Sequence, residues 1–270
     1  MIHFNFGAAS ATQTRRHTAD INNTYTCIRI KQLTFYRLLL FTMDSSLLIL
    51  NGDCLDNVFQ FFSLDELMVI FGEVHPFIDD AIHRQLHRFR DFEFSMRFPP
   101  QYNEEQLKTL GGHLRSLNVN VGYSTRSVDV LKLLHQLFIG AKESGRLQAL
   151  KIQHTNFTNP YMTIIMPVAS TLRELDLGRC DIEDYNQLML LLQSATNLEI
   201  LALYNKDIAC LDESVLNRLR SLKINWLVGT AMFDVSEISR KHPLLSIKVY
   251  HFDNVDVYGP PLIGKTGYFH

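Results

Sequence analysis

The chain has 270 residues, of which 46% are apolar and 20% are charged. This composition is typical of a folded globular protein and excludes a disordered or fibrous chain. With 26 basic and 28 acidic residues, the formal charge of −2 argues against a dedicated nucleic-acid binder, which needs a basic field.

Neither a membrane span nor a disulfide framework is expected from the sequence. No apolar run reaches the roughly 18 to 20 residues that a spanning helix needs. The four cysteines, Cys27, Cys54, Cys180 and Cys210, are widely spaced and form no C-x-x-C pair. This usage suits a reducing compartment, so we expect the protein in the cytoplasm, the nucleus or both.

Residues 1–42 differ in composition from the rest of the chain. They hold five basic residues and one acid, Asp20, and they are rich in Thr and Asn. We expect a poorly ordered N-terminal segment. Two alternatives stay open, namely a mitochondrial targeting peptide, because such peptides are Arg-rich and acid-poor, or a translation start at Met43.

Residues 43–87 are predicted to form a small helical domain. Asn51 or Asp53 can cap a first helix and Ser63 a second, and a third helix is predicted to follow Pro76. Helices this short are marginal alone, so we expect a neighbouring surface to stabilise them.

The pattern L-x-x-L-x-L, with Ile, Val or Phe as substitutes, recurs through the C-terminal two thirds of the chain. First positions follow one another at intervals of 21 to 33 residues. The copies are Phe89/Phe92/Phe94, Leu114/Leu117/Val119, Leu147/Leu150/Ile152, Leu172/Leu175/Leu177, Leu198/Leu201/Leu203, Leu219/Leu222/Ile224 and Leu244/Ile247/Val249. This periodicity is typical of leucine-rich repeats, which are 20–29 residues long.

Each copy is predicted to be a short strand, because alternate side chains of a strand point the same way. One such strand cannot bury its apolar side, whereas stacked copies build a parallel sheet with helices on the return path. Helices are predicted at 125–142, 183–193, 212–219 and 234–240. We therefore expect an α/β fold, with parallel strands on the concave face and helices on the outer face.

The residue after each strand varies, which predicts an irregular, shallow solenoid over residues 88–254. Leucine-rich repeats commonly place Asn or Cys there. One copy has Cys180, but others have Gly122, Thr155 or Lys206. Residues 255–270 are predicted to be a C-terminal tail containing Pro and Gly.

Residues 50–81 resemble the F-box family, with apolar residues at the family's positions and Asn51 in place of its usual Pro. An F-box followed by leucine-rich repeats is similar to the substrate receptors of Skp–cullin–F-box ubiquitin ligases. The resemblance implies docking onto a Skp-type adaptor, and through it a cullin scaffold. The implied adaptor-binding residues are Leu50, Leu55, Val58, Phe59, Phe62, Leu64 and Leu67.

An alternative is a leucine-rich-repeat interaction scaffold with no link to a ligase, in which the helical unit only caps the solenoid. The two interpretations differ in whether the box exposes an apolar patch. Under either interpretation the repeats would bind a protein target through outward-facing strand positions. The candidate target-binding residues are Asn118, Gln153, Asp176, Tyr204, Asn225 and Tyr250. Trp226 is either a further anchor or part of the core.

The sequence predicts a non-catalytic protein without a cofactor or metal. Residues 259–266 satisfy the P-loop formula G-x-x-x-x-G-K-[ST], but only four residues follow, too few for the helix that cradles phosphate. His83 and His87 could ligate a metal from one helix face, but no third ligand lies beside them.

Overall fold

The computed structural model describes residues 50–227 and 235–252. The predicted N-terminal segment 1–42 and the tail 255–270, with its P-loop-like sequence, lie outside the described residues. The chain divides into two compact units, residues 1–85 and residues 86–270.

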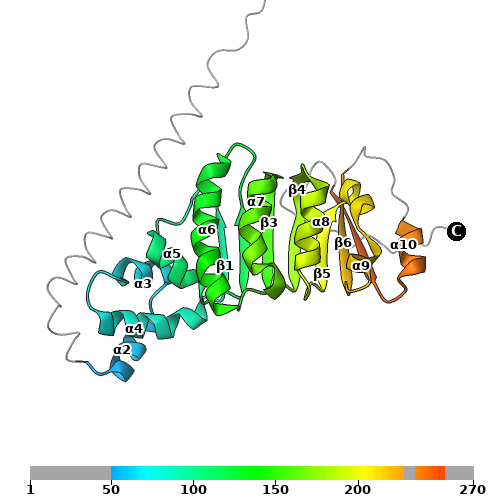
Figure 1. Cartoon of the computed structure of the whole chain (residues 1–270). Helices are drawn as coiled ribbons and strands as arrows, with labels where there is room; N and C mark the ends of the chain where they lie inside the picture. Colours follow the sequence, from blue (N-terminus) through cyan, green and yellow to red (C-terminus); the bar gives the residue numbers. More distant parts are fainter. Residues whose placement is uncertain (1–49, 228–234, 253–270) are drawn as a thin grey trace, which may run out of the picture. The chain divides into compact units, whose positions relative to one another are not determined.

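Three short helices form the described part of the first unit: α2 (Gly52–Phe59), α3 (Leu64–Ile70) and α4 (Pro76–Gln85) (Figure 1). The side chain of Asn51 accepts a hydrogen bond from the backbone of Cys54, which satisfies a free N–H group in the first turn of α2. Ser63 and Glu66 form a reciprocal capping box at the start of α3. The predicted start of all three helices is confirmed.

The first unit has an apolar interior fixed at its edges by polar contacts. Leu55, Phe59, Leu67, Ile78 and Ile82 are buried. The guanidinium of Arg84 on α4 lies 2.9 Å from the carboxylate of Asp56 on α2. The backbone N–H of Gly72, whose φ of 82° suits a residue without Cβ, donates to the carboxylate of Asp79.

The second unit is an α/β structure built on one open, seven-stranded, all-parallel sheet. Its strands lie side by side in chain order from β1 to β7, so each strand is followed by a connection that returns to the next position in the sheet. The strands are β1 (Asp91–Ser95), β2 (Ser116–Asn120), β3 (Ala149–Phe157), β4 (Glu174–Ile182), β5 (Ile200–Tyr204), β6 (Ser221–Leu227) and β7 (Ser246–Phe252). The α-helices are α5 (Glu104–Gly111), α6 (Ser127–Ser144), α7 (Asn159–Ile165), α8 (Tyr185–Ser194), α9 (Glu213–Leu216) and α10 (Val235–Lys241).

Short 3₁₀ segments complete the connections: η1 (Leu86–Arg88), η2 (Met166–Thr171) and η3 (Asn205–Cys210). The helices predicted at 125–142, 183–193, 212–219 and 234–240 are confirmed as α6, α8, α9 and α10, with differences of up to three residues at their ends. Helix α7 was not predicted, because its seven residues give too short a stretch for the helical period to be recognised.

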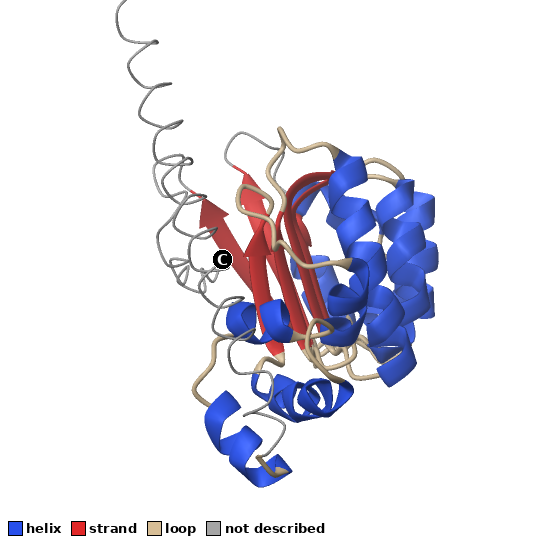
Figure 2. Cartoon of the chain, turned by 90° about the vertical axis from the view of Figure 1, so that its left-hand side faces the viewer, coloured by secondary structure: helices blue, strands red, loops and turns tan. Residues whose placement is uncertain are grey.

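Leucines of successive strands align in rows across the sheet and form the core. The second position of every repeat lies opposite its counterparts on neighbouring strands. This row comprises Phe92, Leu117, Leu150, Leu175, Leu201, Leu222 and Ile247. Because consecutive parallel strands are joined by right-handed crossovers, the connecting helices fall on one face of the sheet. Figure 2 shows helices of this unit along one face of the sheet.

Candidate functional site

Helices α5–α9 lie on one face of the sheet, and we call the opposite face the open face (Figures 1 and 2). Alternation along each strand sends every second residue to this side. Its central row reads Glu93, Asn118, Lys151, Asp176, Ala202, Lys223 and Lys248. The row one step nearer the strand starts reads Asp91, Ser116, Ala149, Glu174, Ile200, Ser221 and Ser246.

The open face is hollowed over the first four strands. A cavity of about 390 Å³ lies there, lined by residues of both rows. Ser116 and Ala149 are small and lie between the longer side chains of Asp91 on β1 and Glu174 on β4, so the floor is low where these two residues meet. We call this cavity the hollow. It gives the open face room for a side chain of a binding partner.

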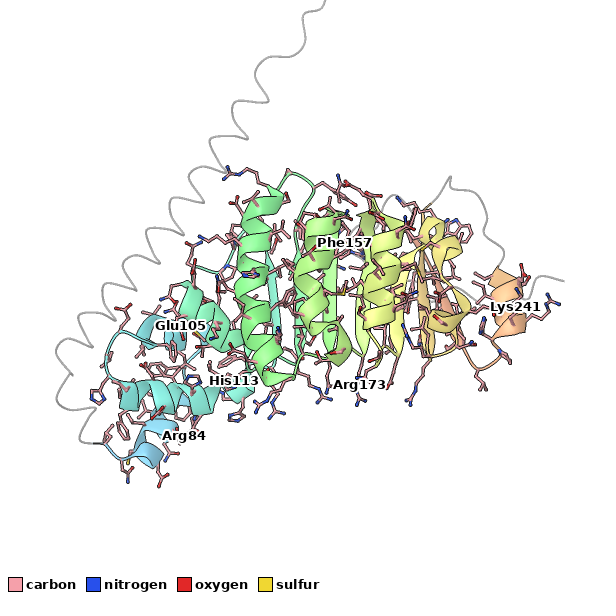
Figure 3. All side chains as sticks on the ribbon, in the orientation of Figure 1. Arg84, Glu105, His113, Phe157, Arg173 and Lys241 are labelled. Carbon is pink, nitrogen blue, oxygen red and sulfur yellow. The ribbon has the colours of Figure 1, made fainter. Side chains whose placement is uncertain are left out.

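A second cavity, of about 320 Å³, continues from the hollow to the edge where the strands begin. It shares Asp91, Ser116, Ala149 and Glu174 with the hollow. Arg115 and Arg173, which precede β2 and β4, line its outer rim. In Figure 3 the side chain of Arg173 lies at this edge of the sheet.

Most charges in the hollow are paired with one another. The Lys223 ammonium lies 2.6 Å from the carboxylate of Glu174, a contact that passes over the small side chain of Ala202 on the intervening strand. The Lys151 ammonium lies 3.4 Å from the carboxylate of Asp176. These pairs fix the wall of the hollow on β4 and leave that side nearly neutral.

Two irregularities shape the open face near the ends of β3 and β4. The pairing of these strands shifts on either side of Gln153, so that one strand and then the other carries an extra residue. His154, at the second shift, has a φ of 57°, the left-handed value that a residue with a Cβ rarely adopts. At the first shift, the Asn225 amide on β6 donates to the Gly178 carbonyl at 2.7 Å, reaching past β5.

Aromatic and titratable side chains gather around these irregularities. The rings of Tyr123 and His154 meet edge to face, with their centroids 6.2 Å apart. Burial lowers the pKa of His154, and the charges of Arg179 and Lys151 lower it further, so the ring is neutral near pH 7. Burial is also the largest cause of the raised pKa of Tyr204, so this phenol stays protonated and can act as a hydrogen-bond donor.

One buried carboxyl lies behind this region, in η3. Asp207 is 0% exposed, and the Tyr185 hydroxyl donates to its Oδ1 at 2.9 Å. Its Oδ2 is buried with no hydrogen-bond partner among the described residues. Burial raises the pKa of Asp207 to about 6, because a charged carboxylate is poorly solvated there.

The predicted target-binding residues all lie on strands of the sheet but differ in accessibility. Gln153, Tyr204 and Asn225 are at most 9% exposed, and the Asn225 amide is already bonded to Gly178. Asn118, Asp176 and Tyr250 are partly exposed. Asn118 and Asp176 line the hollow, so these two are best placed to touch a partner, whereas their target-binding role stays a prediction.

The predicted adaptor-binding residues are divided between the interior and the surface of the first unit. Leu55, Phe59 and Leu67 are buried, with 0%, 1% and 0% exposure. Leu50, Phe62 and Leu64 are partly exposed, and Val58 is exposed. The most exposed apolar residue nearby is Phe61, at 82%. It is not among the predicted adaptor-binding residues, because it falls between the apolar positions of the F-box pattern.

Among the described residues, no three His, Cys, Asp or Glu side chains are close enough together to hold a metal ion. Three cysteines in the described ranges are free thiols, and the buried Cys180 thiol donates to the carbonyl of Ile152 at 3.1 Å. No described helix has the length and apolar character that crossing a bilayer requires.

Comparison with known proteins adds no identification. The chain matches no protein-family model, and no curated protein matches it.

Proposed function

We propose that this chain is a non-catalytic substrate receptor of a Skp–cullin–F-box type ubiquitin ligase. In this proposal the three-helix unit docks onto a Skp-type adaptor, and the second unit is a leucine-rich-repeat solenoid that holds a target protein on its open face. The receptor would work in the cytoplasm or the nucleus, where such ligases act.

The open face is the observation that carries the target-binding half of the proposal. Its rows of polar side chains and its hollow of about 390 Å³ lie on the side of the sheet away from helices α5–α9. A leucine-rich-repeat interpretation is supported by strands in unbroken chain order and by the aligned row from Phe92 to Ile247. Mixed charges on this face suit a protein partner.

The adaptor-docking half is supported by the apolar surface of the first unit. Val58 is 38% exposed and Phe61 is 82% exposed, and both belong to the end of α2 and the turn after it. Exposed aromatic and branched side chains close together are typical of protein interaction sites. Because Leu55 and Phe59 are buried, docking would use Val58, Phe61 and the partly exposed Phe62 and Leu64.

A second candidate function is a leucine-rich-repeat scaffold without a ligase link. The burial of Leu55, Phe59 and Leu67 favours it, because these side chains pack in the interior of the helical unit and cannot contact an adaptor. The two candidates agree on the open face and differ only in what the first unit binds.

Adaptor affinity distinguishes the two candidates. We expect the full chain to bind a purified Skp-type adaptor, and the double variant Val58→Ala/Phe61→Ala to bind it with a free energy weaker by about 2 kcal/mol, roughly thirtyfold in Kd. Isothermal titration calorimetry measures this difference. Both side chains are exposed, so the variant should keep the fold.

The matched control is Phe98→Ala, which removes an aromatic side chain that is 64% exposed in the second unit. It should leave adaptor affinity unchanged. Absence of binding by the unmodified chain would support the scaffold and exclude the ligase receptor. If the native chain, the Val58→Ala/Phe61→Ala variant and the Phe98→Ala variant bound the adaptor with equal affinity, Val58 and Phe61 would not form the docking surface.

A further inference from the structure

Two carboxylates on β1 border the hollow without a cationic partner. Asp91 and Glu93 are exposed, and no ion pair joins either of them to a base within the described residues. They are two residues apart on one strand and so point to the same side, about 6.6 Å apart along it. A single cationic group at the hollow can therefore approach both carboxylates.

The other charged side chains that line the hollow itself are paired with one another. Glu174 pairs with Lys223 and Asp176 pairs with Lys151. At the rim, Arg173 lies 3.6 Å from Glu199, while the Arg115 guanidinium donates to the side-chain oxygen of Gln148. Within the part of the chain that the structure describes, the β1 wall thus carries two negative charges without an ion-pair partner, opposite a β4 wall that is nearly neutral.

The space beside these carboxylates fits a long side chain that ends in hydrogen-bond donors. The floor is low at Ser116 and Ala149, and the Ser116 hydroxyl offers a further acceptor next to Asp91. The apolar Cβ of Ala149 can contact a methylene stem. A lysine or arginine combines such a stem with a positively charged head.

We propose that the hollow binds a lysine or arginine side chain of the target protein, with Asp91 and Glu93 as its charge partners. This inference rests on the proposed function, since it names the chemistry that the open face selects. Charge complementarity at a partly enclosed wall favours a basic segment over an acidic one and would raise the association rate at low salt.

The test selects peptides from a phage-displayed library of random nine-residue sequences on the full chain. We expect enriched peptides with a lysine or arginine at one fixed position. For a synthesised winner, replacing that residue by Gln should weaken binding at least tenfold in fluorescence anisotropy. With the Asp91→Asn/Glu93→Gln variant, the same replacement should have no effect, as in a double-mutant cycle.

The matched control is Glu104→Gln/Glu105→Gln, which removes the same charge from two exposed residues of α5. It should keep the full preference for the basic peptide. A preference that survives neutralisation of Asp91 and Glu93 would overturn the inference.

The outcome also separates this inference from the proposed function. One possible result is that the selected peptides contain no basic residue and that their binding is lost when Ala149→Trp fills the hollow. This result would refute the inference but would keep the open face as a binding surface. Enrichment of no peptide at all would contradict both.

Discussion

Asp207 is the residue whose environment is least expected from the sequence. It lies in the short η3 segment and is fully buried, and among the described residues only the Tyr185 hydroxyl donates to it. An aspartate in a polar stretch after a strand would ordinarily be exposed. Because the Asp207 carboxyl is buried, the stability of the second unit depends on whether this carboxyl is protonated.

The sign of this effect follows from the two pKa values. The folded-state pKa is about 6, above the ordinary value of 3.8. Between these values the unfolded chain has released its proton while the folded chain still holds it. The free energy of unfolding therefore falls as pH rises from about 4 to about 6. Above about pH 6 the buried carboxylate is charged, and its cost to the folded state no longer changes with pH.

Asp207→Asn should remove that penalty, because an amide oxygen can accept the Tyr185 hydrogen bond without carrying charge. We expect the variant to be more stable than the native chain at pH 7.5 and to gain less at pH 4.5, as measured by urea unfolding at both values. The control Glu183→Gln changes an exposed carboxyl. An equal gain at the two pH values would contradict the burial argument.

At the scale of elements, α5 and α6 pack closely against each other at two glycines. A Cβ added at Gly140 would lie 1.8 Å from the carbonyl oxygen of Lys108, and one added at Gly111 would lie 2.0 Å from that of Leu137. Both clashes are with backbone atoms, which cannot move aside as a side chain can. The two glycines therefore set the separation of these helices.

Gly140→Ala should destabilise the second unit by about 2 kcal/mol, since the cost of overpacking exceeds the gain in helix propensity. Urea denaturation measures this. The control is His135→Ala, an exposed position on the same helix, which should change stability by less than about 0.5 kcal/mol. A stabilised Gly140→Ala variant would mean that the helices separate at little cost.

The elements differ in how well the sequence predicts them, and the reasons are physical. Asn51 and Ser63 are strong capping residues, and the structure confirms the helices that follow them. Leu117, Leu150 and Leu175 recur at the spacing of stacked strands and do align in one row. These signals are local, or repeat along the chain, so a single sequence contains them.

Other features depend on tertiary contacts and left no signal in the sequence. His154, at the second shift in the pairing, has a positive φ that no glycine announces, and the reach of Asn225 to Gly178 spans 47 residues. Helical spacing puts Phe59 on the same face as Leu55 and leaves Phe61 off that face, but it does not tell whether the face is buried within the unit or exposed to a partner; the structure buries Leu55 and Phe59. The hollow arises from two small residues on neighbouring strands, Ser116 and Ala149, which are far apart in the sequence.

For the whole molecule, the proposal assigns one task to each unit. The first unit has an exposed apolar surface at Val58 and Phe61, and the second has an open polar face with an acidic wall at Asp91 and Glu93. A receptor that joins an adaptor to a target needs two such surfaces, and variants of one should leave binding at the other unchanged.

Affinity purification of the tagged full chain from cells, followed by mass spectrometry, tests this account most directly. It predicts that a Skp-type adaptor and a cullin are recovered with the native chain, are lost with Val58→Ala/Phe61→Ala, and are retained with Asp91→Asn/Glu93→Gln. Recovery of neither adaptor nor cullin with the native chain would contradict the account.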